Sequence, residues 1–242
     1  MKKAEKAYSE LLDVHTHMLP DMDDGSESIQ ESLEMIRLSV DDGVRAICMT
    51  PHFYPGNESL SSFLKRRDAS IESLVKATKD MEDRPEIYFG AEVEFFEGIS
   101  RTGDIEQMAI GNSGILLVEM PFDRWTSRTL SELYELRDYR EVTPLIAHVD
   151  RYLDFGNENA VDELIDNGIL IQANASFFLK GFGSRRAMRM IRQEKIHFLG
   201  SDAHNLRSRR PNLGMAAQKI CSKCGEDSME YLKHFQNMIR AR

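Results

Sequence analysis

Short apolar runs alternate along this chain with longer segments of helical periodicity. Seven runs rich in Val, Ile and Leu predict strands buried on both faces of a parallel sheet: Leu11–Val14, Val44–Met49, Glu86–Phe89, Ile115–Met120, Pro144–Ala147, Ile169–Gln172 and Ile196–Leu199. Helical patterns lie between them at Ser26–Val40, Ser59–Met81, Ser127–Tyr139, Glu158–Asn167 and Ser184–Glu194, and Leu213 to Ile239 predicts one or two more helices. This alternation predicts an α/β fold, a closed or nearly closed βα barrel, with an open doubly wound sheet as the alternative.

Capping signals mark both ends of the first predicted helix. Ser28 and Glu31 have the spacing of a capping box near its start. Gly43 follows its last apolar position and provides a C-terminal cap, because glycine adopts the left-handed conformation at low cost. Both signals support a helix over Ser26–Val40.

Composition and charge narrow the class of protein. The 242 residues, 41% of them hydrophobic, suffice for one large core. We expect one domain over residues 1–242, with an N-terminal extension at 1–10 and a helical C-terminal segment at 213–242. The formal net charge of −9 leaves no electrostatic footprint for a nucleic-acid backbone, and bound divalent cations would offset part of it.

Targeting signals are not evident in the sequence. No run approaches the ~18 apolar residues of a membrane-spanning helix, and the basic N-terminal residues have no apolar stretch behind them, so we expect neither membrane insertion nor a signal peptide. Three cysteines are too few for a disulfide scaffold, and the Cys221-x-x-Cys224 pair in the helical tail lacks a second ligand pair for zinc. We expect a cytoplasmic protein.

Side chains that bind metal ions gather where the predicted strands end. In a βα barrel all these ends open onto one face, so residues far apart in sequence converge there. Five of the seven histidines occupy such positions. The set is His15, His17, His52, Glu92, Glu94, Glu119, His148, Asp202 and His204.

Taken singly, each of these residues has a simpler explanation, such as a buried histidine bonded to a backbone acceptor or a turn at Asp23-Asp24-Gly25. Taken together, they would be costly to desolvate without cations. Imidazole and carboxylate without thiolate suit manganese, iron or zinc. A surplus of ligands indicates two or three ions with open positions, which is the arrangement used in metal-assisted hydrolysis.

The same residues resemble the PHP (polymerase and histidinol phosphatase) superfamily, most closely the bacterial manganese-dependent protein-tyrosine phosphatases of capsule and exopolysaccharide operons. The resemblance extends from about Asp13 to Ala217. Its motifs are His15-Thr16-His17, Asp23-Asp24-Gly25, Thr50-Pro51-His52, Gly90-Ala91-Glu92, Val118-Glu119-Met120-Pro121, Ile146-Ala147-His148-Val149-Asp150-Arg151-Tyr152 and Ser201-Asp202-Ala203-His204-Asn205.

The resemblance implies a single-domain, distorted (β/α)7 TIM-like barrel of the PHP type with a trinuclear site. One ion would be held by His15, His17, Glu92 and Asp202. Glu92 would bridge to a second ion, held also by Glu119 and His148, and the third would be held by Asp24, His52 and His204.

Two arginines of the family grip the phosphate, and here they match Arg151 and Arg209. A guanidinium offers a planar, permanently charged fork to phosphate oxygens. Val149-Asp150 stands where the family has Pro-Glu, and Arg209-Arg210-Pro211 where it has Arg-Pro-Pro, so Arg209 and Arg210 both remain candidates for the second contact. We expect Arg151, Arg209, Asp202 and His204 to be the catalytic residues.

The function implied by the resemblance is that of a manganese-dependent phosphotyrosine-protein phosphatase, whose partner would be a tyrosine autokinase of polysaccharide export. A histidinol phosphatase and a catalytically silent metal-binding scaffold are the alternatives. An aryl substrate also needs a pocket that accepts its ring. The aromatic candidates near the strand ends are Phe53, Tyr54, Phe122, Trp125, Phe177 and Phe178.

Overall fold

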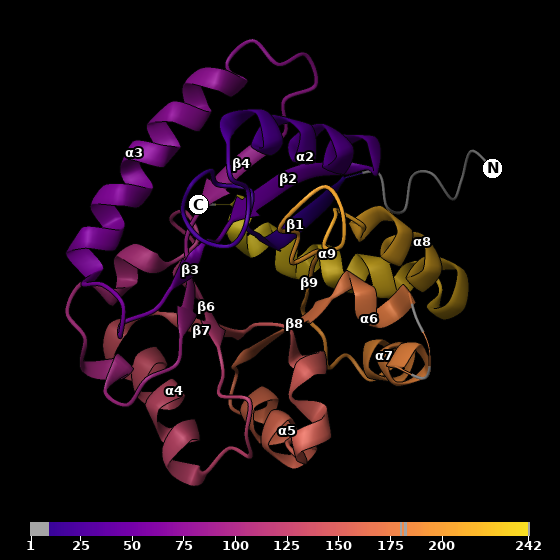
Figure 1. Ribbon diagram of the computed structural model, residues 1–242. Coiled ribbons are helices and arrows are strands. Elements are labelled where there is room, and N and C mark those ends of the chain that lie inside the picture. Colours follow the sequence, from indigo (N-terminus) through magenta and orange to yellow (C-terminus); the bar gives the residue numbers. More distant parts are fainter. Residues whose placement is uncertain (1–9, 180, 182, 242) are drawn as a thin grey trace.

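The computed structural model describes residues 10–179, 181 and 183–241, so the N-terminal extension expected at 1–10 lies outside the described residues except for Glu10. A curled parallel sheet stands at the centre, with helices around it (Figure 1). The strands are β1 (Leu11–Thr16), β2 (Val44–Met49), β3 (His52–Phe53), β4 (Glu86–Phe89), β5 (Glu92–Glu94), β6 (Ile115–Glu119), β7 (Thr143–Ile146), β8 (Leu170–Asn174) and β9 (Phe198–Gly200).

The helices follow the strands in alternation, as predicted. They are α2 (Ile29–Asp41), α3 (Leu60–Thr78), α4 (Ser127–Arg140), α5 (Glu158–Asp166), α6 (Ala175–Leu179), α7 (Gly183–Arg192), α8 (Leu213–Cys224) and α9 (Glu226–Arg240), with short 3-10 helices η1 (Ile99–Arg101), η2 (Ile105–Met108), η3 (Val149–Arg151) and η4 (Leu153–Phe155). Gly225, at φ +93°, divides the predicted tail into α8 and α9. The five-residue α6 was not among the predicted helices.

Two predicted strands extend further than expected. After breaks of only two residues, β2 continues as β3 and β4 continues as β5. Pro51 has no N–H to donate at the first break. At the second, Gly90 lies so close to Ile110 that a Cβ would be 3.0 Å from its side chain. His52, Glu92 and Glu94 therefore lie in strands, where the sequence alone places them in the segments after strands.

The sheet closes on itself through β1 and the segment after β9. Neighbouring strands pair in parallel in the orders β1-β2-β4 and β3-β5-β6-β7-β8-β9. The circle is completed by a parallel bridge between Thr16 and Ala203, where His17 N donates to Ala203 O at 2.9 Å. This arrangement is a distorted βα barrel and excludes the open doubly wound sheet.

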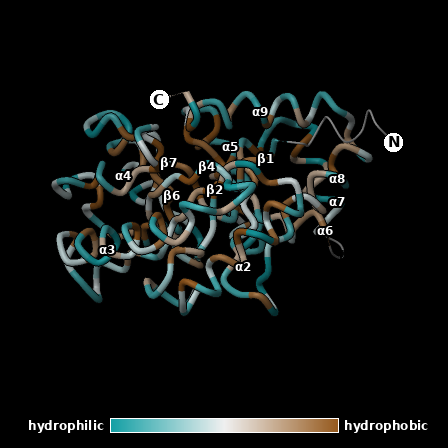
Figure 2. The backbone as a smooth tube through the Cα atoms, turned by 90° about the horizontal axis from the view of Figure 1, so that it is seen from above, coloured by the Kyte–Doolittle hydropathy of each residue, from teal (hydrophilic) through white to brown (hydrophobic). Residues whose placement is uncertain are grey.

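Apolar side chains form an inner and an outer core. The inner core fills the barrel with residues such as Val14, Leu117 and Phe198, and Ile239 of α9 packs into it beside Phe235. The outer core lies between the strands and the surrounding helices. Hydrophobic residues accordingly concentrate on the central strands in Figure 2. Because α9 packs across the amino-terminal end, the carboxyl ends of the strands remain available for a site.

The capping prediction for α2 is confirmed at both ends, with one difference. The hydroxyl of Ser28 accepts from Glu31 N at 3.2 Å, and Gly43 has φ +95°. The Glu31 carboxylate accepts from Glu27 N, not from Ser28 N, so only half of a capping box forms. Among the described residues, no helix has the length and apolar character needed to cross a membrane.

Candidate metal centre

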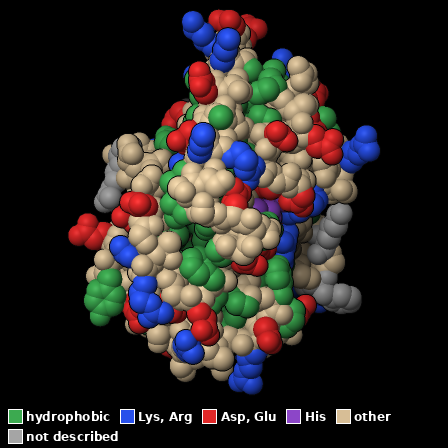
Figure 3. Space-filling view, turned by 60° about the vertical axis from the view of Figure 1, so that its left-hand side comes forward, with side chains coloured by type: hydrophobic (Ala, Val, Ile, Leu, Met, Phe, Trp, Pro, Cys, Tyr) green, Lys and Arg blue, Asp and Glu red, His purple; other side chains and the backbone are tan. Residues whose placement is uncertain are grey.

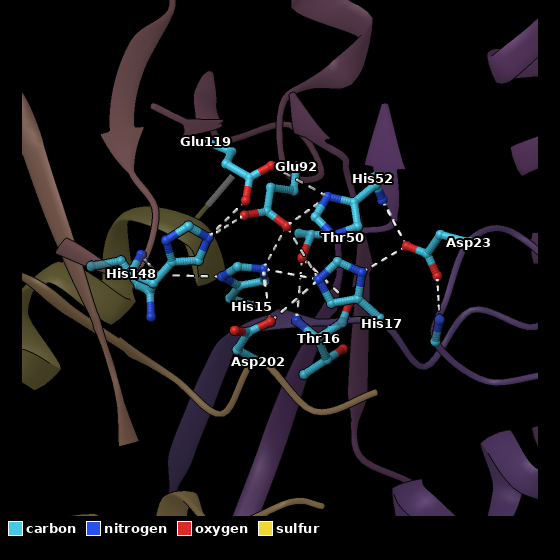
Figure 4. A network of polar contacts seen from close by, with 12 residues as sticks. His15, Thr16, His17, Asp23, Thr50, His52, Glu92, Glu119, His148 and Asp202 are labelled. Carbon is cyan, nitrogen blue, oxygen red and sulfur yellow. Dashed lines mark hydrogen bonds and ion pairs between the residues drawn. The ribbon is translucent and has the colours of Figure 1, made fainter. Parts of the chain in front are cut away.

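The predicted metal-binding side chains meet at the carboxyl ends of the strands. All nine residues assigned to ions from the sequence take part in one polar network, most of which Figure 4 shows: His15, His17, Asp24, His52, Glu92, Glu119, His148, Asp202 and His204. Most are buried, whereas Asp24 exposes 67% of its side chain. In the space-filling view, histidine is visible in a hollow bordered by charged side chains (Figure 3).

Glu92 is at the centre of the network. Its Oε2 lies 3.0 Å from His15 Nε2, 3.2 Å from His17 Nε2 and 3.1 Å from His52 Nδ1. Its other oxygen, Oε1, lies 2.8 Å from His148 Nε2. A fully buried carboxylate that faces four imidazoles is suited to bridge cations, because each oxygen can serve a different ion.

Three overlapping groups bring their donor atoms within 4.8 Å of one another: His17, Asp24, His52 and His204; His15, His17 and Asp202; and His52, Glu92 and Glu119. The first two contain the sets inferred from the family resemblance, apart from Glu92. His52 differs, because it belongs to two groups: Nε2 faces Asp24 at 3.9 Å and Nδ1 faces Glu119 at 3.8 Å. His148 joins the third group through Glu119, at 3.4 Å.

The donor atoms fit a set of divalent cations. His52 Nδ1 and His204 Nε2 are buried, and within the described part of the chain neither makes a hydrogen bond of normal geometry, although carboxylate oxygens lie 3.1 Å and 3.3 Å away. Both nitrogens face the cluster, and a buried polar atom without a partner is costly. Imidazole nitrogen and carboxylate oxygen together suit manganese, iron or zinc. The structure therefore accommodates the metal ions that the resemblance implies.

Protons on histidine balance the carboxylates inside the cluster. Burial would lower the pKa of His17, but the charges and hydrogen bonds of Asp23 and Glu92 raise it to about 10. Burial would likewise lower the pKa of His148, but hydrogen bonds to Glu119 and Glu92 raise it to about 9. A cation bound here would displace these protons, since metal ligands must be deprotonated.

Asp23 supports two histidines of the cluster, a role that the sequence analysis did not predict. Its Oδ2 accepts from His17 Nδ1 at 2.6 Å and from His52 N at 2.7 Å, and its Oδ1 accepts from Gly25 N at 2.9 Å. Histidines that bind metals donate their second ring N–H to such a carboxylate, which fixes the ring. The two adjacent acidic residues, Asp23 and Asp24, were the available signal in the sequence. The sequence analysis assigned only Asp24, to an ion, and gave Asp23 no role in the cluster.

Gln172 supports the cluster from within β8. Its Oε1 accepts from His148 N at 2.5 Å and lies 3.3 Å from His15 Nδ1. The residue is fully buried at the end of an otherwise apolar predicted strand. A buried amide in such a run needs partners, and this was the available signal.

Backbone strain marks the same region. His148 has φ +25° and Asp202 has φ +54°, conformations that side chains other than glycine rarely adopt. Gly25 is required for a different reason: a Cβ would lie 2.2 Å from His17 O. The loop that carries Asp23 can therefore pack against His17 only with glycine at position 25.

Arg151 and Arg209 converge on Asp202. Arg151 donates to Asp202 Oδ2, which also accepts from Asn174 Nδ2 at 3.0 Å, and Arg209 Nη2 donates to Oδ1 at 2.7 Å. Arg210 is exposed; burial raises the pKa of Asp42, and the charge of Arg210 offsets part of that rise. Of these two arginines, Arg209 lies at the cluster and Arg210 does not.

The other chemically active residues stay outside the cluster. Cys221 and Cys224 lie on α8, where Cys224 Sγ contacts Met188. His197 Nδ1 accepts from Ile171 N at 2.9 Å, as expected of a structural histidine.

Comparisons with known proteins point in one direction. The sequence model of the family described as "Capsular polysaccharide synthesis, CpsB/CapC" matches residues 11–240. The chain is 29% identical to the tyrosine-protein phosphatase CpsB of Streptococcus agalactiae serotype III, over 95% of this chain and 98% of that one. It is 31% identical to the putative tyrosine-protein phosphatase CapC of Staphylococcus aureus, over 82% of this chain and 79% of that one.

Solved structures show the same fold. A structure described as that of YwqE from Bacillus subtilis and CpsB from Streptococcus pneumoniae, "unique metal-dependent tyrosine phosphatases", superposes with a TM-score of 0.81 at 24% identity, over 96% of this chain and 95% of that one. Histidinol phosphate phosphatase from Lactococcus lactis, complexed with zinc, histidinol and phosphate, gives a TM-score of 0.54 at 14% identity, over 94% of both chains. The chain thus shares its barrel fold with these two structures.

Proposed function

The chain belongs to the CpsB/CapC family of capsular polysaccharide synthesis, and from this premise we propose that it is a metal-dependent phosphatase of phosphotyrosine proteins. The observation that carries the proposal is the cluster around Glu92, flanked by two arginines on Asp202. Its histidines and carboxylates suit cations, and its guanidinium groups suit the oxygens of a phosphate.

We assign the nine clustered side chains to manganese, as two or three ions. Glu92 would be the bridging ligand, because its two oxygens face different histidines. Asp23 and Gln172 would hold the rings of His17 and His15, which keeps their Nε2 atoms directed at Glu92. When bound, the ions would activate water and offset the negative charge of the phosphate.

Arg151 and Arg209 would bind the non-bridging phosphate oxygens. Their contacts with the two oxygens of Asp202 show that both guanidinium groups reach one small anionic group. Asp202 and His204 lie between these arginines and the rest of the cluster, so we place them among the catalytic residues. The tyrosine leaving group has a pKa of about 10, so it needs less protonation than a serine alkoxide would.

The substrate would be a phosphotyrosine protein, and the family resemblance suggests a tyrosine autokinase of polysaccharide export. Relatives named tyrosine-protein phosphatase match at 29–31% identity, whereas the histidinol phosphate phosphatase matches at 14%. This difference favours phosphotyrosine over histidinol phosphate.

A parallel assay tests the assignment. The full chain loaded with manganese is given a phosphotyrosine peptide, a phosphoserine peptide and histidinol phosphate, and kcat/KM is measured for each. We expect the phosphotyrosine peptide to be hydrolysed most efficiently. Faster turnover of histidinol phosphate would overturn the choice of substrate, and no turnover of any of the three would overturn the proposed activity.

A further inference from the structure

Two aromatic side chains stand at the mouth of the cluster with partly exposed rings, and neither belongs to the residues that we assign to metal ions. Tyr54 follows β3 and stacks on His52, with ring centroids 4.9 Å apart and planes at 23°. Phe122 follows β6 and stacks over His148 at 6.2 Å and 15°. Phe122 leaves 50% of its surface exposed, and Tyr54 is half-buried.

The other aromatic candidates have structural roles. Phe53, Trp125 and Phe178 are buried, and Phe53 packs on Phe63. Phe177 packs against Gly183 at the start of α7, 3.2 Å from the position of a Cβ there. The structure therefore reduces the six candidates from the sequence to Tyr54 and Phe122.

The two rings flank the same part of the cluster. Glu119 connects the histidines on which they stack, because Oε2 lies 3.8 Å from His52 Nδ1 and Oε1 lies 3.4 Å from His148 Nε2. In the order of the sheet, β3 and β6 are separated only by β5. Tyr54 and Phe122 thus stand on either side of the Glu92 and Glu119 carboxylates.

The arginines occupy a different sector of the rim. Arg151 follows β7 and Arg209 follows β9, and these two strands are separated by β8. The mouth consequently has a cationic sector at β7–β9 and an aromatic sector at β3–β6. In Figure 3, Lys and Arg side chains and hydrophobic side chains border the histidine-containing hollow on different sides.

Phe122 is held firmly from behind. Its ring packs on the buried ring of Tyr152, with centroids 5.4 Å apart, and the ring of Tyr152 packs on Trp125, with centroids 5.2 Å apart. The Tyr152 hydroxyl accepts from Met120 N at 2.9 Å, and Trp125 N donates to Asn157 Oδ1 at 2.9 Å. A fixed, half-exposed ring gives a ligand apolar surface at little cost in side-chain entropy.

We propose that Tyr54 and Phe122 bind the aryl ring of the substrate while Arg151 and Arg209 bind its phosphoryl group, so that these two rings determine the preference for aryl over alkyl phosphates. The inference rests on the proposed function, since it assigns the part of the same site that contacts the leaving group. A ring bound against them would cover the exposed face of Phe122 and gain stacking contacts.

Inhibition by phosphonates separates the ring from the phosphoryl group. The manganese-loaded full chain is assayed on a phosphotyrosine peptide, and Ki is measured for phenylphosphonate and for methylphosphonate in the wild type, Tyr54→Leu and Phe122→Leu. We expect each substitution to raise the Ki for phenylphosphonate by about three- to tenfold, the range of one aromatic contact. The Ki for methylphosphonate should not change. KM for the peptide should rise by a similar factor.

The control is Tyr139→Leu, which removes an aromatic ring that is 78% exposed on α4, outside the cluster. It should change neither Ki. If Tyr54→Leu and Phe122→Leu raised the Ki for both inhibitors equally, or changed neither Ki, the proposed role of the rings would be overturned. A wild-type protein that hydrolyses no phosphotyrosine peptide would instead overturn the proposed function itself.

Discussion

Arg209 donates through Nη2 to Asp202 Oδ1 at 2.7 Å, which places an exposed-loop arginine against a buried carboxylate of the cluster. The loop is held for this contact, because Asn205 Oδ1 accepts from the backbone N–H groups of Arg207, Ser208 and Arg209. The neighbouring Arg210 is exposed on the surface, and its charge only offsets part of the rise in the pKa of Asp42 that burial causes. One residue therefore separates an arginine at the site from one on the outer surface.

Arg209→Lys and Arg210→Lys form a matched pair. We expect Arg209→Lys to lower kcat/KM for a phosphotyrosine peptide by about 10- to 100-fold, the size of one charge-assisted hydrogen bond, because a point ammonium cannot reproduce the fork. Arg210→Lys should remain within about twofold of the wild type. The reverse order would assign the phosphate contact to Arg210.

Asp23→Asn tests how His17 is held. Asparagine has one acceptor oxygen, so it cannot accept from Gly25 N and also from His17 Nδ1 and His52 N, and its NH2 group must face N–H donors on one side. We expect manganese affinity, measured by calorimetry on the metal-free chain, to fall by about 10- to 100-fold. The exposed Asp21, in the same loop, provides the control Asp21→Asn, which should bind as the wild type does. Equal affinity in both variants would refute the role of Asp23.

His197 predicts a pH dependence of stability that is independent of the metal. Burial lowers its pKa from 6.5 to about 4, so the unfolded chain binds the proton more readily than the folded one. The contribution of neutral His197 to the free energy of unfolding is complete above pH 6.5 and is lost as the pH falls towards 4. Between pH 7 and 5 it amounts to about 2 kcal/mol.

The substitution His197→Asn removes this titration and retains an acceptor for Ile171 N. With a chelator present throughout, urea unfolding at pH 7 and pH 5 should show a loss of stability that is smaller in the variant by about 2 kcal/mol. The same loss in both proteins would show that His197 does not contribute to it.

Much of the fold and of the cluster followed from the sequence. Apolar runs located the strands because both faces of a parallel sheet are buried, and the histidines at their ends predicted the convergence at Glu92. The breaks at Pro51 and Gly90 were not predicted, because they depend on neighbours such as Ile110 that only the folded barrel brings close.

The residues that support the cluster were harder to predict than the residues that form it. Asp23 and Gln172 contact His17 and His148, and the hydrogen bond between Gln172 and His148 joins residues that are 24 positions apart in sequence. Whether Arg209 or Arg210 lies at the cluster depends on the path of the loop that carries them. The residue type alone does not reveal that path. Periodicity predicts elements, whereas such contacts are set by tertiary packing.

The central claim is that this cluster is a polynuclear metal site at which phosphotyrosine is hydrolysed. The most direct test is a titration of the metal-free full chain with manganese, in which bound metal and phosphotyrosine-peptide hydrolysis are measured on the same samples. We predict that activity is absent without metal and rises to its maximum at two or three ions per chain, since the donor atoms form three overlapping groups around Glu92 and His17. Full activity in the metal-free chain, or saturation at one ion, would contradict the account.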